Sequence, residues 1–306
     1  MNKFSHVAVM PAEVLQYLEI DPDKIYFDCT LGAAGHSQLI LEQLTSTGCL
    51  YSFDQDINVI NSHRPLQHLI NTKAQENGFK SKWNLIHANF AELESFCREE
   101  NIKINGGILV DLGISSIQLD DPERGFSYLS EAKLDMRMNP ELEISADDVI
   151  NNFRETDLAN IFYNYAEERL SRQIAERIIE KRPIKSCLEL ADIVKQVYFR
   201  KYHKHSKVHP ATKVFQALRI YVNKELEVLE NLLDSLPKVL EHGARVVIIS
   251  FHSLEDRIVK LFLKKSTDEY KFELCFKKPL VASEEELKEN SRSRSAKLRA
   301  AKFILK

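Results

Sequence analysis

The chain has 306 residues, of which 44% are hydrophobic and 28% charged, and its formal net charge is −3. Such a composition excludes a disordered, collagen-like or low-complexity chain and provides a core for one large or two ordinary domains. The five cysteines are widely spaced and form no CxxC motif, which favours reduced thiols over disulfides and predicts no metal site. No apolar run reaches the ~18 residues of a membrane span, and the N-terminus has no secretory signal, so we expect a cytoplasmic protein without membrane association.

The first half of the chain alternates short apolar strands with helical segments. Strands are predicted at 25–30, 49–54, 83–88 and 107–111, and the spacing predicts helices at 37–44 and 90–99. This alternation is typical of a parallel sheet with helices on both faces, whose ligands bind at the carboxyl ends of the strands. A fifth strand is predicted at 244–250, and segments 270–276 and 296–303 are candidates to complete the sheet.

Acidic residues lie at or near the ends of three of the predicted strands. Asp54 stands where a carboxylate accepts the ribose hydroxyls of a nucleoside cofactor. We expect Asp28 near the cofactor's ammonium group, Phe90 beside its adenine, and Asp111 where the reacting atoms meet. The glycines in segment 32–35 allow a tight turn, but the third glycine of a dinucleotide fingerprint is absent. The pattern therefore favours S-adenosylmethionine, with a nicotinamide oxidoreductase as an alternative.

Strand signals fade between about 119 and 218, which predicts a helical insert. Helical periodicity covers 148–165, 168–181 and 186–199. Pro183 is expected to end the second of these segments, and Ser186 with Glu189 predicts a capping box for the third.

Basic residues concentrate in two windows. Residues 195–219 contain seven Lys and Arg and no acid, with aromatic residues interleaved, and residues 288–306 contain seven Lys and Arg against one Glu. Segregated positive charge with aromatic side chains is typical of RNA binding, although a solvated helix face and a basic tail give the same pattern. The candidate RNA contacts are Lys201, Lys204, Lys207, His209, Lys213 and Arg219.

The segment 251–257 follows the predicted fifth strand. Ser253, with Asp256 three residues later, predicts a helix cap. This leaves His252 at the carboxyl edge of the sheet, near the expected substrate, and makes it a second candidate catalytic residue beside Asp111.

Nine segments match the motif order of one family over nearly the whole chain. They are His6–Met10, Asp28–Ser37, Asp111–Asp121, Arg124–Ser127, Leu134–Met138, Tyr165–Arg169, His209–Arg219, Ile249–Arg257 and Ser291–Arg299. On these segments the chain resembles the bacterial ribosomal RNA small subunit methyltransferase H family. The resemblance implies a Rossmann-like α/β fold of class I S-adenosylmethionine-dependent methyltransferases, with a methyltransferase domain at 1–119 and 219–306. It implies a helical RNA-recognition insert at 120–218.

The resemblance also implies the reaction and the cofactor contacts. Members methylate the exocyclic N4 of a decoding-region cytidine in 16S rRNA, so rRNA or the small ribosomal subunit is the expected partner. For the oligomeric state, a monomer and a homodimer are both compatible with the sequence. The family's cofactor contacts fall on Ala34, Gly35, His36, Asp54, Phe90, Asp111 and Gln118. Ala34 and Cys29 replace usual glycines, whereas every charged group is retained.

The chemistry of methyl transfer to an amine explains why an acid is expected beside the cofactor. Transfer from a sulfonium requires nucleophile, methyl carbon and sulfur to be held in line. The cytosine amine is a weak nucleophile, so an acceptor for its N–H is needed, and Asp111 is the candidate, also as proton acceptor. Carbon-5 methylation would need a cysteine nucleophile near the fourth or fifth strand, and none is there. Ribose 2′-hydroxyl methylation using Asp111, Lys213 and Glu255, and a non-catalytic RNA-binding assembly factor, are the alternatives.

Overall fold

The computed structural model describes residues 8–45, 47–77, 82–203, 209–268 and 271–305. The chain divides into two compact units. We call them the sheet unit, Met1–Gly113 with Leu226–Lys306, and the helical unit, Ile114–Glu225. These junctions differ by several residues from the domain bounds expected from the sequence, and the role of the insert in RNA recognition stays a prediction.

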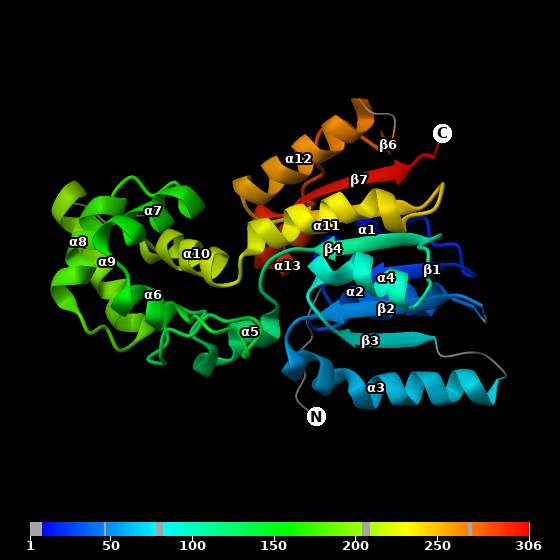
Figure 1. The fold of residues 1–306 in the computed structure, drawn as a ribbon, viewed down its shortest axis with the longest axis horizontal. Coiled ribbons are helices and arrows are strands. Elements are labelled where there is room, and N and C mark those ends of the chain that lie inside the picture. Colours follow the sequence, from blue (N-terminus) through cyan, green and yellow to red (C-terminus); the bar gives the residue numbers. More distant parts are fainter. Residues whose placement is uncertain (1–7, 46, 78–81, 204–208, 269–270, 306) are drawn as a thin grey trace. The chain divides into compact units, whose positions relative to one another are not determined.

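A seven-stranded sheet forms the centre of the sheet unit (Figure 1). Its strands are β1 (Ile25–Asp28), β2 (Cys49–Asp54), β3 (Trp83–His87), β4 (Gly107–Asp111), β5 (Arg245–Ser250), β6 (Phe272–Leu274) and β7 (Lys297–Phe303). The order is β3-β2-β1-β4-β5-β7-β6, and β7 runs antiparallel to both of its neighbours. All seven predicted strands are confirmed, and the order is that of a Rossmann-like sheet with an antiparallel strand inserted near one edge.

Helices cover both faces of this sheet because alternate strand residues point to opposite faces. On one face Phe27, Ile108 and Val246 pack with α4 (Leu93–Glu99), α11 (Glu225–Val239) and α12 (Ser253–Asp268). On the other face Tyr26 and Leu109 share a core with α1 (Pro11–Leu18), α2 (Gly35–Gln43) and α3 (Ile57–Glu76). The remaining elements are α13 (Glu284–Glu289) and the 3-10 turns η1 (Phe90–Glu92) and η3 (Ser291–Ser295).

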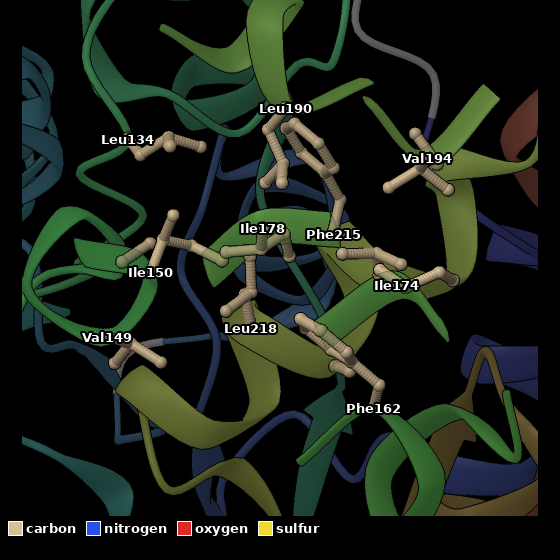
Figure 2. Close-up of a cluster of buried hydrophobic side chains, with 14 of the residues drawn as sticks. Leu134, Val149, Ile150, Phe162, Ile174, Ile178, Leu190, Val194, Phe215 and Leu218 are labelled. Carbon is tan, nitrogen blue, oxygen red and sulfur yellow. The ribbon is translucent and has the colours of Figure 1, made fainter. Parts of the chain in front are cut away.

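The helical unit has a core of its own. It contains α5 (Ser116–Asp120), η2 (Pro122–Arg124), α6 (Ala146–Asn152), α7 (Glu155–Ala166), α8 (Ser171–Lys181), α9 (Cys187–Tyr202) and α10 (Ala211–Val222). Figure 2 shows Phe162, Ile178, Leu190 and Leu218 converging from four of these helices, and each is fully buried. No helix among the described residues is long and apolar enough to cross a bilayer.

The predicted continuous helix over 148–165 is wrong, because the chain breaks between α6 and α7. Phe153 and Arg154 are both extended. The Arg182 guanidinium donates to the carbonyl oxygens of Ile150 and Phe153, at 2.7 and 2.6 Å. These carbonyls at the end of α6 therefore find partners outside the helix, which stabilises its early termination.

Candidate active site

Four parallel strands, β2, β1, β4 and β5, end at one edge of the sheet unit. The strand order reverses between β1 and β4, since chain connections from β1 run toward β2 and β3 whereas β4 continues toward β5. In open α/β sheets such a reversal leaves a crevice in which ligands bind. Asp54 and Asp111 are the last residues of β2 and β4. Both candidate site residues therefore lie at this edge of the sheet.

The turn from β1 into α2 has a left-handed backbone at two positions. Gly32 has φ 47°, and Ala34, the residue before α2, has φ 62°. For alanine this conformation costs ~1–2 kcal/mol, which explains why glycine is usual there. The Ala34 methyl group is completely buried in the core under the turn, and burial of one such group returns ~0.8 kcal/mol. Burial of this methyl group thereby offsets part of the cost of the left-handed backbone at Ala34.

Asp54 fixes this turn from β2. Its Oδ2 accepts the Gly32 N–H at 3.0 Å, and its Oδ1 accepts the Asp56 N–H at 2.9 Å. Burial raises the pKa of Asp54 to about 7, against the opposing effect of these two hydrogen bonds. Each carboxylate oxygen retains a second lone pair, so both can also accept ribose hydroxyls.

The substitution Asp54→Asn is expected to change how stability depends on pH. The pKa of Asp54 is about 7 in the folded chain and ~3.9 when unfolded. The wild-type protein therefore loses stability as the pH rises between these two values, and above pH 7 Asp54 causes no further loss. Asparagine does not ionise. The free energy of unfolding of the variant, minus that of the wild type, should therefore rise by roughly 2–3 kcal/mol from pH 5 to pH 8. Urea unfolding without cofactor measures this; parallel pH profiles would show that Asp54 titrates normally.

Asp111 presents a buried acceptor at the end of β4. Its Oδ1 is buried and accepts no hydrogen bond from the described residues, and the side chain as a whole is 24% exposed. Its Oδ2 lies 3.7 Å from Nε2 of His36, a buried residue in the first turn of α2. Burial raises the pKa of Asp111 well above its usual range, and Asp28 and Glu255 add to this rise. A buried oxygen without a donor favours a ligand that brings an N–H or O–H.

Asp28 is enclosed within the sheet unit. Its side chain is 1% exposed. It accepts hydrogen bonds from the Thr30 N–H, the Thr30 hydroxyl and the Ser37 hydroxyl, at 3.1, 3.3 and 2.7 Å. These three hydrogen bonds give Asp28 a structural role inside the sheet unit, and its expected contact with the cofactor's ammonium group stays a prediction.

Two other predicted cofactor contacts have clear local settings. Phe90 begins η1, which two residues separate from the end of β3, and is partly buried against the aromatic core of that face. Gln118 belongs to the helical unit, where its Oε1 accepts the Ser115 N–H and its side chain is 4% exposed. The contacts of both residues with the cofactor stay predictions, as do the backbone contacts of Gly35.

The predicted cap of the helix after β5 is wrong in its residues. His252 is the N-cap of α12, because its carbonyl accepts the Asp256 N–H. Its Nδ1 accepts the Glu255 N–H at 3.3 Å, and Glu255 Oε2 accepts the N–H groups of Phe251 and His252. Asp256 instead pairs with Lys297 and Arg299 of β7. This geometry gives His252 a structural role, and its catalytic role stays a prediction.

Five of the six predicted RNA contacts divide into three groups. Lys201 and Lys213 are exposed in the helical unit, and Lys213 Nζ donates to the Glu167 carbonyl at 3.3 Å. Lys204 and Lys207 lie outside the described residues. Arg219 is 15% exposed and forms two 2.8 Å hydrogen bonds with Glu225, so its charge is neutralised within the unit instead of facing solvent.

His209, the sixth predicted RNA contact, packs its ring against a tyrosine of the helical unit, and its contact with RNA stays a prediction. It stacks on Tyr128 with ring centroids 4.6 Å apart and planes 6° from parallel. Burial lowers its pKa, and the nearby Lys195 lowers it further. Sequence reasoning missed Tyr128, because the 81 positions that separate it from His209 hide the pair.

Together, the switch-point turn, the acid ending β2 and the buried acceptor ending β4 define a Rossmann-like enzyme with a nucleoside cofactor. The chain belongs to the MraW methylase family, which it matches over residues 3–304. This membership confirms the methyltransferase class and the resemblance found in the sequence, and with them S-adenosylmethionine as the methyl donor. It also excludes the nicotinamide alternative.

Curated relatives are similar along their full length. Ribosomal RNA small subunit methyltransferase H of Koribacter versatilis is 44% identical over 98% of this chain and 95% of its own. The protein of the same name from Fusobacterium nucleatum is 43% identical over 98% and 97%. Among solved structures, an rRNA methylase from Streptococcus thermophilus is similar over 98% of this chain and 100% of that chain, with 11% identity and a TM-score of 0.43. Family membership thus rests on the sequence matches.

Proposed function

We propose that this protein transfers the methyl group of S-adenosylmethionine to the exocyclic N4 of a cytidine in the decoding region of 16S rRNA, in the cytoplasm. In this reaction Asp54 holds the ribose of the cofactor, and Phe90 flanks its adenine. Asp111 accepts a hydrogen bond from the cytosine amine and so turns the nitrogen lone pair toward the methyl carbon.

One observation carries the proposal, namely the buried Oδ1 of Asp111 that accepts no hydrogen bond from the described residues. A buried acceptor is costly unless a donor satisfies it, and the cytosine amine brings two N–H groups. The raised pKa of Asp111 also makes its carboxylate a better proton acceptor than an exposed aspartate. Binding of the cationic sulfonium nearby favours the ionised form of this carboxylate.

The setting of Cys29 favours methylation of the cytosine amine over methylation of ring carbon 5. Cys29 directly follows β1 and is the cysteine in the switch-point turn. It is buried, and burial raises the pKa of its thiol well above the usual value. A thiol that is neutral and inaccessible is a poor nucleophile. Carbon-5 methylation, which needs a thiolate, is therefore disfavoured.

The proposed RNA surface predicts a specific salt dependence. The double variant Lys201→Glu/Lys213→Glu should bind 16S rRNA more weakly, and the slope of log affinity against log salt should fall by about 1.4, since each lost phosphate contact removes ~0.7 for single strands. Lys73→Glu/Lys185→Glu, which changes the charge equally at two other exposed lysines, is the control. Equal slopes for the two variants would assign Lys201 and Lys213 to an ordinary solvated surface.

Methyl transfer to purified RNA tests the enzymatic part of the proposal. The protein is incubated with S-adenosylmethionine labelled in its methyl group and with either 16S rRNA or small ribosomal subunits. We expect label in the RNA with at least one of the two substrates and none when the protein is omitted. RNA binding without transfer to either substrate would favour a non-catalytic assembly factor.

A further inference from the structure

A chain of buried polar side chains runs beneath the candidate site in the sheet unit. Trp83 Nε1 donates to Ser52 Oγ at 2.9 Å, and Ser52 Oγ lies 2.8 Å from Ser37 Oγ. Ser37 Oγ donates to Asp28 Oδ2 at 2.7 Å. A hydroxyl has one proton, so Ser52 must donate to Ser37. Every donor in this chain therefore points toward Asp28, which fits an ionised carboxylate at its end.

Thr30 continues the chain on the other side of Asp28. Its N–H and its hydroxyl both donate to Asp28 Oδ1, at 3.1 and 3.3 Å. The oxygen of the same hydroxyl accepts the backbone N–H of Asp111 at 2.8 Å. One hydroxyl thus links a buried carboxylate to the backbone of the residue that carries the candidate acceptor.

The register of the sheet explains why this link is needed. The last residue pair between β1 and β4 is Asp28 with Leu109, and the Cys29 N–H bonds the Leu109 carbonyl. The chain then turns toward β2, where the Leu31 N–H bonds the Phe53 carbonyl. At Asp111 the hydroxyl of Thr30 therefore takes the place of a backbone carbonyl on the β1 side of β4.

We propose that Thr30 is a positioning residue for methyl transfer, which orients Asp111 through its backbone and is itself held by Asp28. This inference rests on the proposed role of Asp111 as the acceptor of the cytosine N–H. A displacement of about 1 Å in a reacting group can reduce a rate ~100-fold. Loss of the Thr30 hydroxyl should therefore lower the turnover of methyl transfer more than it lowers the binding of either substrate.

Kinetics of Thr30 variants test the proposal. Thr30→Val, which keeps the size but lacks the hydroxyl, should lower kcat for methyl transfer to rRNA by roughly 10- to 100-fold. The KM for rRNA and the Kd for S-adenosylmethionine should stay within about threefold. Thr30→Ser should restore kcat to within about threefold of wild type. Thr30→Ala, which adds no bulk to the turn, replaces the valine variant if that variant fails to fold.

Ser37→Ala is the matched control, because it removes the other hydroxyl that donates to Asp28 and leaves the link to Asp111 intact. We expect its kcat to stay within about threefold of wild type. An equal loss of kcat in Ser37→Ala and Thr30→Val would show that the network merely stabilises the sheet edge. Wild-type kcat in both folded hydroxyl-free variants, Thr30→Val and Thr30→Ala, would likewise overturn the proposal.

The double variant Thr30→Val/Asp111→Ala separates this inference from the proposed function. If Thr30 acts through Asp111, the double variant should be no slower than Asp111→Ala alone. A further loss of kcat in the double variant would mean that Thr30 acts by another route. Wild-type turnover of Asp111→Ala alone would instead refute the proposed role of Asp111, whatever the result for Thr30.

Discussion

Asp111→Ala is expected to lower the rate of methyl transfer by about 10²- to 10⁴-fold, the contribution of a positioned acid or base. Its affinity for rRNA should stay within about threefold of the wild-type value. The carboxylate ends β4, and its buried Oδ1 accepts no hydrogen bond from the described residues. The alanine variant removes this acceptor without altering the exposed lysines of the helical unit. Single-turnover transfer from labelled S-adenosylmethionine measures the chemical step, and filter binding measures the affinity for rRNA.

Two further variants sharpen this result. Asp21→Ala removes an exposed acid that precedes β1, at the opposite edge of the sheet, and should keep wild-type turnover. Asp111→Asn retains an oxygen that accepts the N–H but gives up the basicity. Partial activity in Asp111→Asn would assign the residue mainly to orientation, whereas a loss as large as that of alanine would assign it to proton transfer. Wild-type turnover of Asp111→Ala would make the residue structural.

Asp54→Ala is expected to weaken S-adenosylmethionine binding by about 10- to 150-fold for each ribose hydrogen bond lost, since a hydrogen bond to a charged group is worth ~1.5–3 kcal/mol. The variant also frees the Gly32 N–H, which Asp54 accepts at 3.0 Å, and so loosens the turn into α2. Isothermal titration calorimetry of the free protein with the cofactor measures the effect.

The affinity measured by the same titration should depend more strongly on pH in the wild-type protein than in Asp54→Ala. With the pKa of Asp54 near 7, the ionised form that accepts two hydroxyls becomes less populated below that pH, so the affinity should fall as the solution is acidified from pH 8 to pH 6. Asp54→Ala removes this titrating group and should show a weaker dependence. An affinity unchanged in Asp54→Ala would refute the ribose assignment.

The strand ends could be predicted because they depend on local patterns. Apolar runs that stop at Asp54 and Asp111 mark the carboxyl edge of a parallel sheet, and parallel strands bring such ends together without knowledge of the loops. Segment 296–303 was a candidate to complete the sheet, but the antiparallel direction of β7 depends on its pairing with β5 and β6.

Tertiary partners account for what the sequence did not predict. Asp28, like Asp54, follows an apolar run, but the hydroxyls of Ser37 and Thr30 donate hydrogen bonds to its carboxylate. Arg219 lies in a basic window, but Glu225 neutralises it. Arg182 ends α6 from 29 residues or more away along the chain. In each case the outcome depends on a side chain that the fold brings close. Hydrophobic periodicity and charge counts along the sequence do not predict such contacts.

The position of the transferred methyl group tests the central claim most directly. Small-subunit rRNA is incubated with the protein and isotopically labelled S-adenosylmethionine, digested to nucleosides and analysed by mass spectrometry. We expect the label on N4 of cytidine, because an aspartate that accepts an N–H suits an amine and the buried Cys29 thiol does not suit carbon attack. Label on carbon 5 or on a ribose oxygen, with none on N4, would contradict both the proposed reaction and the role of Asp111.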